Sequence, residues 1–196
     1  MVRKVYVAMV AALVMVLVGA AAQQAPAADT YKIDPMHAIV LYKISHLGLA
    51  NAYGRFNEPT GKVVLDNDDP SKSSFEFEVD ADKVDTGNAK RDAHLKSPDF
   101  FNARQFPKIS YKSTSVSKKG DNQYELTGDL TMHGVTKPIT FVVTKTGEGK
   151  GLKPDEVRTG WEAQVDLKRT DWGIKGLVGP VGDDVHLTVS FEGVKQ

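Results

Sequence analysis

The chain of 196 residues contains no cysteine. This absence excludes a disulfide framework, a metal site built from thiolates and a lipid anchor on cysteine, so stability must come from the hydrophobic core alone. An excess of one charge is also absent, since 25 Lys and Arg stand against 25 Asp and Glu. A nucleic-acid partner needs a concentrated basic face, so we expect none. With 41% hydrophobic residues, the chain can form one domain with a substantial core.

The sequence also lacks the short motifs of common catalytic sites. It has no His-Glu-x-x-His, no Gly-x-Ser-x-Gly, no phosphate-binding Gly loop and no dinucleotide fingerprint. His37 and His46 are nine residues apart and would lie on opposite faces of a regular strand, so they are poor joint metal ligands. We therefore predict a protein that is not an enzyme, with no catalytic residue, no metal and no cofactor.

The first 22 residues have the pattern of a secretory signal peptide. Arg3 and Lys4 precede an apolar run over residues 5–18, and small residues follow up to Ala22. We predict cleavage after Ala22, with Ala27 and Ala28 as alternatives, and a flexible leader over residues 23–28. The run is shorter than the ~20 residues of a spanning helix, so an uncleaved anchor is the less favoured alternative and the mature chain has no transmembrane segment.

The rest of the chain alternates between apolar and polar residues. The clearest example is residues 73–81, where Phe75, Phe77 and Val79 alternate with acidic residues, so one side of the sheet faces water. About eight such strands over residues 29–195, mostly joined by short turns, predict one antiparallel domain, either a sandwich or a barrel. A closed barrel of eight strands is either filled by side chains or holds one slender ligand.

The inward-facing residues of these strands are almost all apolar or aromatic. We predict that they line an interior tunnel: Val40, Tyr42, Ile44, His46, Phe75, Phe77, Val79, Tyr111, Leu126, Phe141, Val143, Trp161, Val165, Leu187 and Val189. A lone histidine on an apolar face is usually a hydrogen-bonded core residue, and this is the favoured interpretation of His46. His186 is predicted to face solvent. We also expect a short strand that stops at Pro35, a bend between Gly48 and Gly54, and a Gly-rich loop over residues 147–155.

One helix interrupts the strands near residues 88–97. Arg91, His94 and Leu95 are spaced to share a helix face, Thr86 or Asn88 supplies the cap, and Pro98 stops the helix. With Phe100 and Phe101, Leu95 is predicted to form a plug that closes one end of the sheet.

The same segment holds the densest group of ionisable residues. These residues, Asp85, Arg91, Asp92, His94 and Asp99, have two interpretations. In the favoured one they cap the helix and bind loop backbone. In the other, Asp85, Arg91 and His94 receive a polar headgroup at the mouth of the barrel, where the planar guanidinium suits phosphate.

A set of motifs recurs in order over nearly all of residues 29–194 and resembles the YceI-like family. They are Tyr31-Lys32-Ile33-Asp34, His37 through His46-Leu47-Gly48, Gly54-Arg55-Phe56, Asp85-Thr86-Gly87, Arg91-Asp92-x-His94-Leu95, Asp99-Phe100-Phe101, Phe106-Pro107, Gly128-Asp129-Leu130-Thr131-x-His133-Gly134-Val135 with Lys137-Pro138, and Arg169-Thr170-Asp171-Trp172-Gly173. The resemblance implies a bacterial periplasmic or secreted protein, a lipocalin-like, extended eight-stranded antiparallel barrel, and a polyisoprenoid or similar long amphiphile as ligand. It implies no catalytic activity.

Two other functions are open at this point. One is an enzyme that acts on a lipid or quinone through His46, Asp85, Arg91 or His94. The other is a ligand-free, filled barrel that serves as a stress-related interaction module. A further expectation concerns assembly, because Ile39, Leu41 and Leu47 make the outward face of residues 38–47 unusually apolar. This face predicts a homodimer, unless another part of the chain covers it.

Overall fold

The computed structural model describes residues 28–196, so the predicted signal peptide and nearly all of the leader lie outside the described residues. The described chain consists mainly of strands. They are β1 (Asp29–His46), β2 (Ala50–Phe56), β3 (Thr60–Leu65), β4 (Ser74–Asp80), β5 (Val84–Asp85), β6 (Lys108–Lys118), β7 (Gln123–Met132), β8 (Val135–Lys150), β9 (Val157–Lys168) and β10 (Val181–Lys195). The helix α1 (Ala89–Lys96) and three short 3₁₀ turns, Pro70–Lys72, Ala81–Lys83 and Arg169–Trp172, complete the structure.

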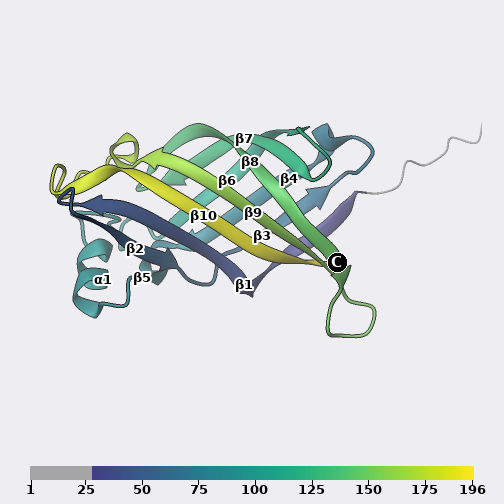
Figure 1. The fold of residues 1–196 in the computed structure, drawn as a ribbon, viewed down its shortest axis with the longest axis horizontal. Coiled ribbons are helices and arrows are strands. Elements are labelled where there is room, and N and C mark those ends of the chain that lie inside the picture. The colour runs from purple at the N-terminus through teal and green to yellow at the C-terminus, as the bar shows by residue number, and fades with distance from the viewer. Residues whose placement is uncertain (1–27) are drawn as a thin grey trace, which may run out of the picture.

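These strands close into an eight-stranded antiparallel barrel. The order runs β10-β9-β8-β7-β6-β4-β3-β1, and pairing between β10 and β1 completes the ring. The strands β2 and β3 share one position, since β3 pairs with the first part of β1 and β2 with the last part. The barrel is elongated, with α1 and the β1–β2 turn at one end and the C-terminus at the other (Figure 1). The predicted fold class is confirmed.

The strand β1 differs from its predicted form. It does not stop at Pro35, because Ile33 pairs with Gly193 and Ala38 with Phe191, and residues 34–37 form a bulge between the two pairs. Proline has no N–H for a ladder hydrogen bond, so the backbone leaves the ladder there and returns to it three residues later.

Two glycine-based predictions are correct at one boundary and wrong at the other, since Gly48 does lie in a turn and residues 151–156 do form a loop. The strand β8 runs through Gly147 and Gly149 to Lys150, and only a short loop precedes β9. Gly54 lies inside β2 beneath the ring of Tyr42 and does not mark a bend. Glycine interrupts a pattern of side chains without interrupting a strand, so alternation misplaces such boundaries.

The helix α1 has its predicted position. The Asn88 side chain caps it by accepting a hydrogen bond from the N–H of Arg91 at 3.0 Å, and the helix ends at Lys96, with Ser97 as its C-cap before Pro98. Within residues 28–196, no helix combines the length and the apolar character that crossing a bilayer requires.

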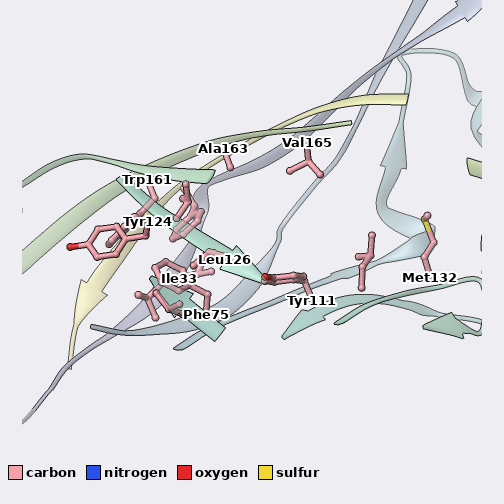
Figure 2. Close-up of a cluster of buried hydrophobic side chains, with 14 of the residues drawn as sticks. Ile33, Phe75, Tyr111, Tyr124, Leu126, Met132, Trp161, Ala163 and Val165 are labelled. Carbon is pink, nitrogen blue, oxygen red and sulfur yellow. The ribbon is translucent and has the colours of Figure 1, made fainter. Parts of the chain in front are cut away.

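The end of the barrel opposite α1 is tightly packed. Trp161 is 1% exposed and contacts the rings of Phe75 at 5.2 Å and Tyr124 at 5.7 Å between centroids. In Figure 2 these rings lie together with Ile33 and Leu126. Because aromatic packing of this density leaves no passage, this end of the barrel is closed.

Candidate functional site

The barrel encloses a cavity of about 850 Å³. Every residue of the predicted tunnel lining borders it except Trp161, and their contact with a ligand stays a prediction. Trp161 faces inward as predicted, but it lies in the packed layer beyond the cavity. Alternation along a strand gives the face of a residue and does not give its depth, so it cannot separate a lining residue from an end plug. A ligand-free module would require an interior filled by side chains, and this interior is not filled.

Several lining residues were not in the predicted set. They are chiefly apolar and come from β1, β2, β3, β6, β7, β8, β9 and β10: Ile33, Phe56, Val63, Ile109, Leu130, Met132, Ile139, Ala163, Leu167, Val185 and Phe191. Ile109, Ile139, Ala163, Leu167, Val185 and Phe191 continue the same alternation along strands already recognised, so the pattern could have found these six.

Two tyrosine hydroxyls lie in the apolar wall. The ring of Tyr111 packs over Gly128, where an added Cβ would come within 2.6 Å of the hydroxyl oxygen. The Tyr111 hydroxyl is buried and has no hydrogen-bond partner among the described residues. Burial raises the pKa of Tyr111 above its ordinary value and raises the pKa of Tyr42 to about 12. Both phenols are therefore neutral at physiological pH.

The cavity opens beside α1. The strand β2 pairs with β5 only through Arg55 and Phe56, so the edge over residues 50–54 lacks a strand partner on that side. Asn51 and Tyr53 border the mouth on this edge. On the other side it is bordered by Thr86, Asn88, Lys90, Arg91 and His94. A polar, basic mouth thus leads into an apolar interior.

The ionisable group has mainly the structural contacts of the favoured interpretation. Arg91 donates from Nε to Thr86 Oγ1 at 2.8 Å and from Nη2 to the Thr86 carbonyl at 2.9 Å. Asp92 accepts from the Thr86 N–H at 2.9 Å, and the ring of His94 lies 2.9 Å from Asp99 Oδ2. Arg91 and His94 nevertheless border the mouth as well.

Asp85 does not belong to the mouth. Its carboxylate accepts hydrogen bonds from Arg55 Nη2 at 2.9 Å and from the Gly87 N–H at 2.8 Å, and it does not border the cavity. These bonds hold the pKa of Asp85 below its ordinary value. The prediction of Asp85 as a mouth residue is therefore wrong. Its two partners hold the carboxylate beside β2 and the turn that follows β5, away from the cavity.

His46 is not the hydrogen-bonded core residue that we favoured. It borders the mouth at the end of β1, where it is exposed, and its ring has no hydrogen-bond partner among the described residues. Its alternation with Val40 and Ile44 gave the correct face, but the strand ends at the opening. In residues 28–196, no three His, Asp or Glu side chains are grouped so as to hold a metal ion.

The predicted plug residues pack beneath the helix and border the cavity. Phe101 contacts Phe56 edge to face at 5.2 Å between centroids, and Phe100 contacts the ring of His94 at 5.0 Å. Leu95 packs against the same core. These contacts fix the segment after α1 against the inside of the barrel, so that it narrows the open end.

Arg169 also fixes this end, and sequence reasoning missed it. It is 5% exposed and donates to four backbone carbonyls: Nε to Gly182 at 2.7 Å, Nη1 to Ile174 at 3.0 Å and Gly176 at 2.7 Å, and Nη2 to Val181 at 3.0 Å. Burial lowers its pKa. The bonds hold the connection between β9 and β10 against the mouth. Periodicity carries no signal for such a role, because the partners are backbone carbonyls of the loop before β10 and of the first two residues of β10.

Comparisons with known proteins agree with this architecture. The model of the YceI-like domain matches residues 31–193. Protein YceI of Escherichia coli O157:H7 is 41% identical over 177 residues, which cover 89% of this chain and 91% of that protein. A UPF0312 protein of Pseudomonas aeruginosa has the same identity and coverage.

Solved structures share the fold. The crystal structure of Burkholderia cenocepacia BcnA has a TM-score of 0.73 at 20% identity and covers 82% of this chain and 98% of its own. A polyisoprenoid binding domain from Saccharophagus degradans, implicated in plant cell wall breakdown, has a TM-score of 0.64 at 12% identity and covers 85% and 98%. At these identities the likeness concerns the fold.

Proposed function

The chain belongs to the YceI-like family, and from this premise we propose that it binds a long-chain isoprenoid or a similar amphiphilic lipid. The tail occupies the barrel cavity and the polar head lies at the mouth. The observation that carries the proposal is an apolar cavity of about 850 Å³ that is closed at one end and open at the other beside basic side chains. A cavity of this size falls within the range of small-molecule sites.

Burial of the tail is sufficient to supply the affinity. Each CH₂ group removed from water contributes ~0.8 kcal/mol, so about ten carbons contribute roughly 8 kcal/mol before the cost of immobilisation. A net free energy of that size corresponds to a Kd on the order of 1 μM, so a tail of about fifteen carbons reaches it once roughly 4 kcal/mol is subtracted for immobilisation. No catalytic group is needed, and the family and its structural neighbours point to a binding protein more than to an enzyme.

Charge at the mouth favours an anionic or strongly polar head. Lys90 and Arg91 lie in the first turn of α1 and border the opening together with His94. Arg91 uses Nε and Nη2 to hold Thr86, which leaves its other guanidinium nitrogen, Nη1, for a ligand. A phosphate or carboxylate placed there gains charge-assisted hydrogen bonds.

We place this activity in the bacterial envelope, in the periplasm or outside the cell, where the protein carries or sequesters its lipid. The support is the charged and then apolar character of residues 1–22, which is typical of an export signal.

Native mass spectrometry tests the proposal. The protein is isolated without detergent from the cells that produce it, sprayed under native conditions and then denatured to release its ligand. We expect a lipid-sized adduct on the native protein that disappears on denaturation. If the protein carries no adduct and takes up no isoprenoid alcohol or phosphate offered in excess, the proposal is wrong.

A further inference from the structure

The open end of the barrel carries a cluster of exposed hydrophobic side chains. Leu47 and Leu49, on the β1–β2 turn, are 56% and 85% exposed, and Tyr53 on β2 is 63% exposed. Leu177 and Val178, between β9 and β10, are 54% and 53% exposed. We call these five residues the apolar rim. The two turns are joined by a hydrogen bond of 2.6 Å from the Leu47 N–H to the Pro180 carbonyl, and they lie at the same end of the barrel in Figure 1.

Exposed hydrophobic side chains are concentrated at this end. Of the eight that are most exposed in residues 28–196, five form the rim, and the others are Met36, Leu41 and Leu152. Leu152 lies on the β8–β9 turn at the opposite end of the barrel. A gathered apolar surface on an otherwise polar protein marks an interaction site.

Unpaired basic side chains flank the rim. Lys90 and Arg91 on α1 and Lys175 beside Leu177 are exposed, and none forms an ion pair with a carboxylate of the described residues. Of the nearby acidic side chains, Asp85 is paired with Arg55 and Asp99 lies beside His94, whereas Asp92 bonds only to Thr86 and offsets one of the three basic charges. The rim therefore presents aliphatic and cationic groups together.

We infer that the apolar rim docks on the surface of a bilayer containing anionic lipid. Aliphatic side chains that enter the boundary between headgroups and acyl chains, with basic residues beside lipid phosphates, are the features of interfacial membrane binding. A second copy of the chain fits the rim less well, because a symmetric contact would bring the unpaired cations of both copies into one interface.

Docking of this kind would place the cavity mouth against the bilayer. Tyr53 and Leu177 belong both to the rim and to the cavity lining, so the two surfaces are continuous. A lipid tail could then pass between bilayer and barrel without crossing water, where each exposed CH₂ costs ~0.8 kcal/mol. This last step rests on the proposed function, whereas the docking itself does not.

Vesicle co-sedimentation tests the inference. The protein is mixed with vesicles of phosphatidylcholine alone or with phosphatidylglycerol added, at low salt. We expect binding to the anionic vesicles that weakens as salt is added. The double variant Leu49→Asp/Val178→Asp should bind at least tenfold more weakly, since neither residue borders the cavity and both belong to the rim. The matched control Leu152→Asp, at the opposite end, should bind like the original protein.

Two further variants test the contribution of the basic residues that flank the rim. Each basic residue near an anionic surface contributes about 1 kcal/mol, so Lys90→Gln and Lys175→Gln should each weaken binding about fivefold, whereas Lys153→Gln on the β8–β9 turn should not. The inference is overturned if the protein does not bind anionic vesicles or if the rim variant Leu49→Asp/Val178→Asp binds them as tightly as the original protein. It is also overturned if sedimentation shows that the original protein is a dimer and that the rim variant is a monomer.

A second measurement separates this inference from the proposed function. The rim variant is offered a short isoprenoid alcohol in solution, and we expect normal uptake because its cavity is intact. Lost vesicle binding with retained uptake supports docking by the rim. Uptake without any vesicle binding by the original protein would overturn the docking alone, and failure of uptake in the original protein would overturn the proposed function.

Discussion

The depth that a ligand reaches can be measured at Val143. This residue is 2% exposed and borders the closed end of the cavity, where its β7 partner Tyr124 already belongs to the packed layer beyond. The substitution Val143→Trp fills space there without burying a charge. It should therefore shorten the cavity from the closed end and leave the mouth unchanged.

The expected loss follows from the carbons that are displaced. Excluding the last isoprene unit of a long tail removes about five carbons at roughly 0.8 kcal/mol each, so affinity falls by at most about 4 kcal/mol, or roughly a thousandfold. A short tail that never reaches Val143 loses nothing. The assay is a series of isoprenoid alcohols of increasing length, with the Kd of each measured by competition against a fluorescent lipid.

In the original protein the affinity should rise with length until the cavity is full, and in Val143→Trp it should stop rising at a shorter length. Thr140→Trp is the matched control, because it adds the same side chain to the exposed face of the same strand. Overpacking costs about 1 to 3 kcal/mol of stability, so the fold of each variant is checked by thermal unfolding. Equal affinities for every length in the folded variant would refute a tail that extends to Val143.

Four other predictions follow from the structure. Hydrogen bonds from His37 and then Arg158 lower the pKa of Asp34 from 3.8 to about 2, so this carboxylate stabilises the fold above pH 4 and the effect is lost as the pH falls toward 2. After screening by solvent is allowed for, Asp34→Asn should remove about 1 kcal/mol from the free energy of unfolding at pH 7 and nothing below pH 2, as urea titrations at several pH values will show, and parallel pH profiles for the two proteins would contradict this. His94→Ala and Arg91→Ala should weaken binding of an isoprenoid phosphate by ~1 kcal/mol and leave the neutral alcohol unaffected, whereas equal losses for both ligands would assign the two residues to holding α1 in place. Tyr111→Phe should leave the binding of a pure hydrocarbon tail unchanged and should weaken, by about 1 kcal/mol, the binding of a ligand that accepts a hydrogen bond from the buried hydroxyl. Calorimetry with both ligand types measures the two effects, and equal effects on both would contradict a role for the hydroxyl. The outward face of β1, where Leu41 is 43% exposed, predicts a homodimer in sedimentation at micromolar concentration that Leu41→Glu dissociates, and a monomer unchanged by Leu41→Glu would exclude that interface.

Alternation predicted an antiparallel domain and most of the cavity lining, but it left a sandwich and a barrel open, and the resemblance to the YceI-like family favoured the barrel. Strict alternation, as in β4 around Phe75 and Phe77, reports which face of a strand is apolar, and antiparallel pairing leaves that face inside. Local capping chemistry located α1 because the Asn88 cap and Pro98 act through neighbouring residues.

The position of an inward-facing residue along the barrel axis and the contacts of residues in loops could not be predicted in the same way. Trp161 and Val143 have the same inward orientation, and only the closure of the barrel makes one an end plug and the other a lining residue. Arg169 binds carbonyls of the β9–β10 connection and of the start of β10, and Asp85 binds Arg55 on β2, so these contacts depend on the path of the backbone in the complete fold. Local patterns contain no information about such contacts.

The seam between β1 and β10 has a consequence for folding kinetics. Its paired residues lie between 135 positions apart, for His46 and Val181, and 164 positions apart, for Tyr31 and Lys195. Closing a loop of this length costs roughly 4 kcal/mol of chain entropy before any pairing compensates it, and chains rich in such distant contacts fold slowly. The residues paired in the other strand ladders are at most 36 positions apart, as for Asp29 and Leu65, so we expect the seam to form last. Until then the cavity is an open sheet with its apolar face in water, and the folding chain is exposed to aggregation for as long as that step takes.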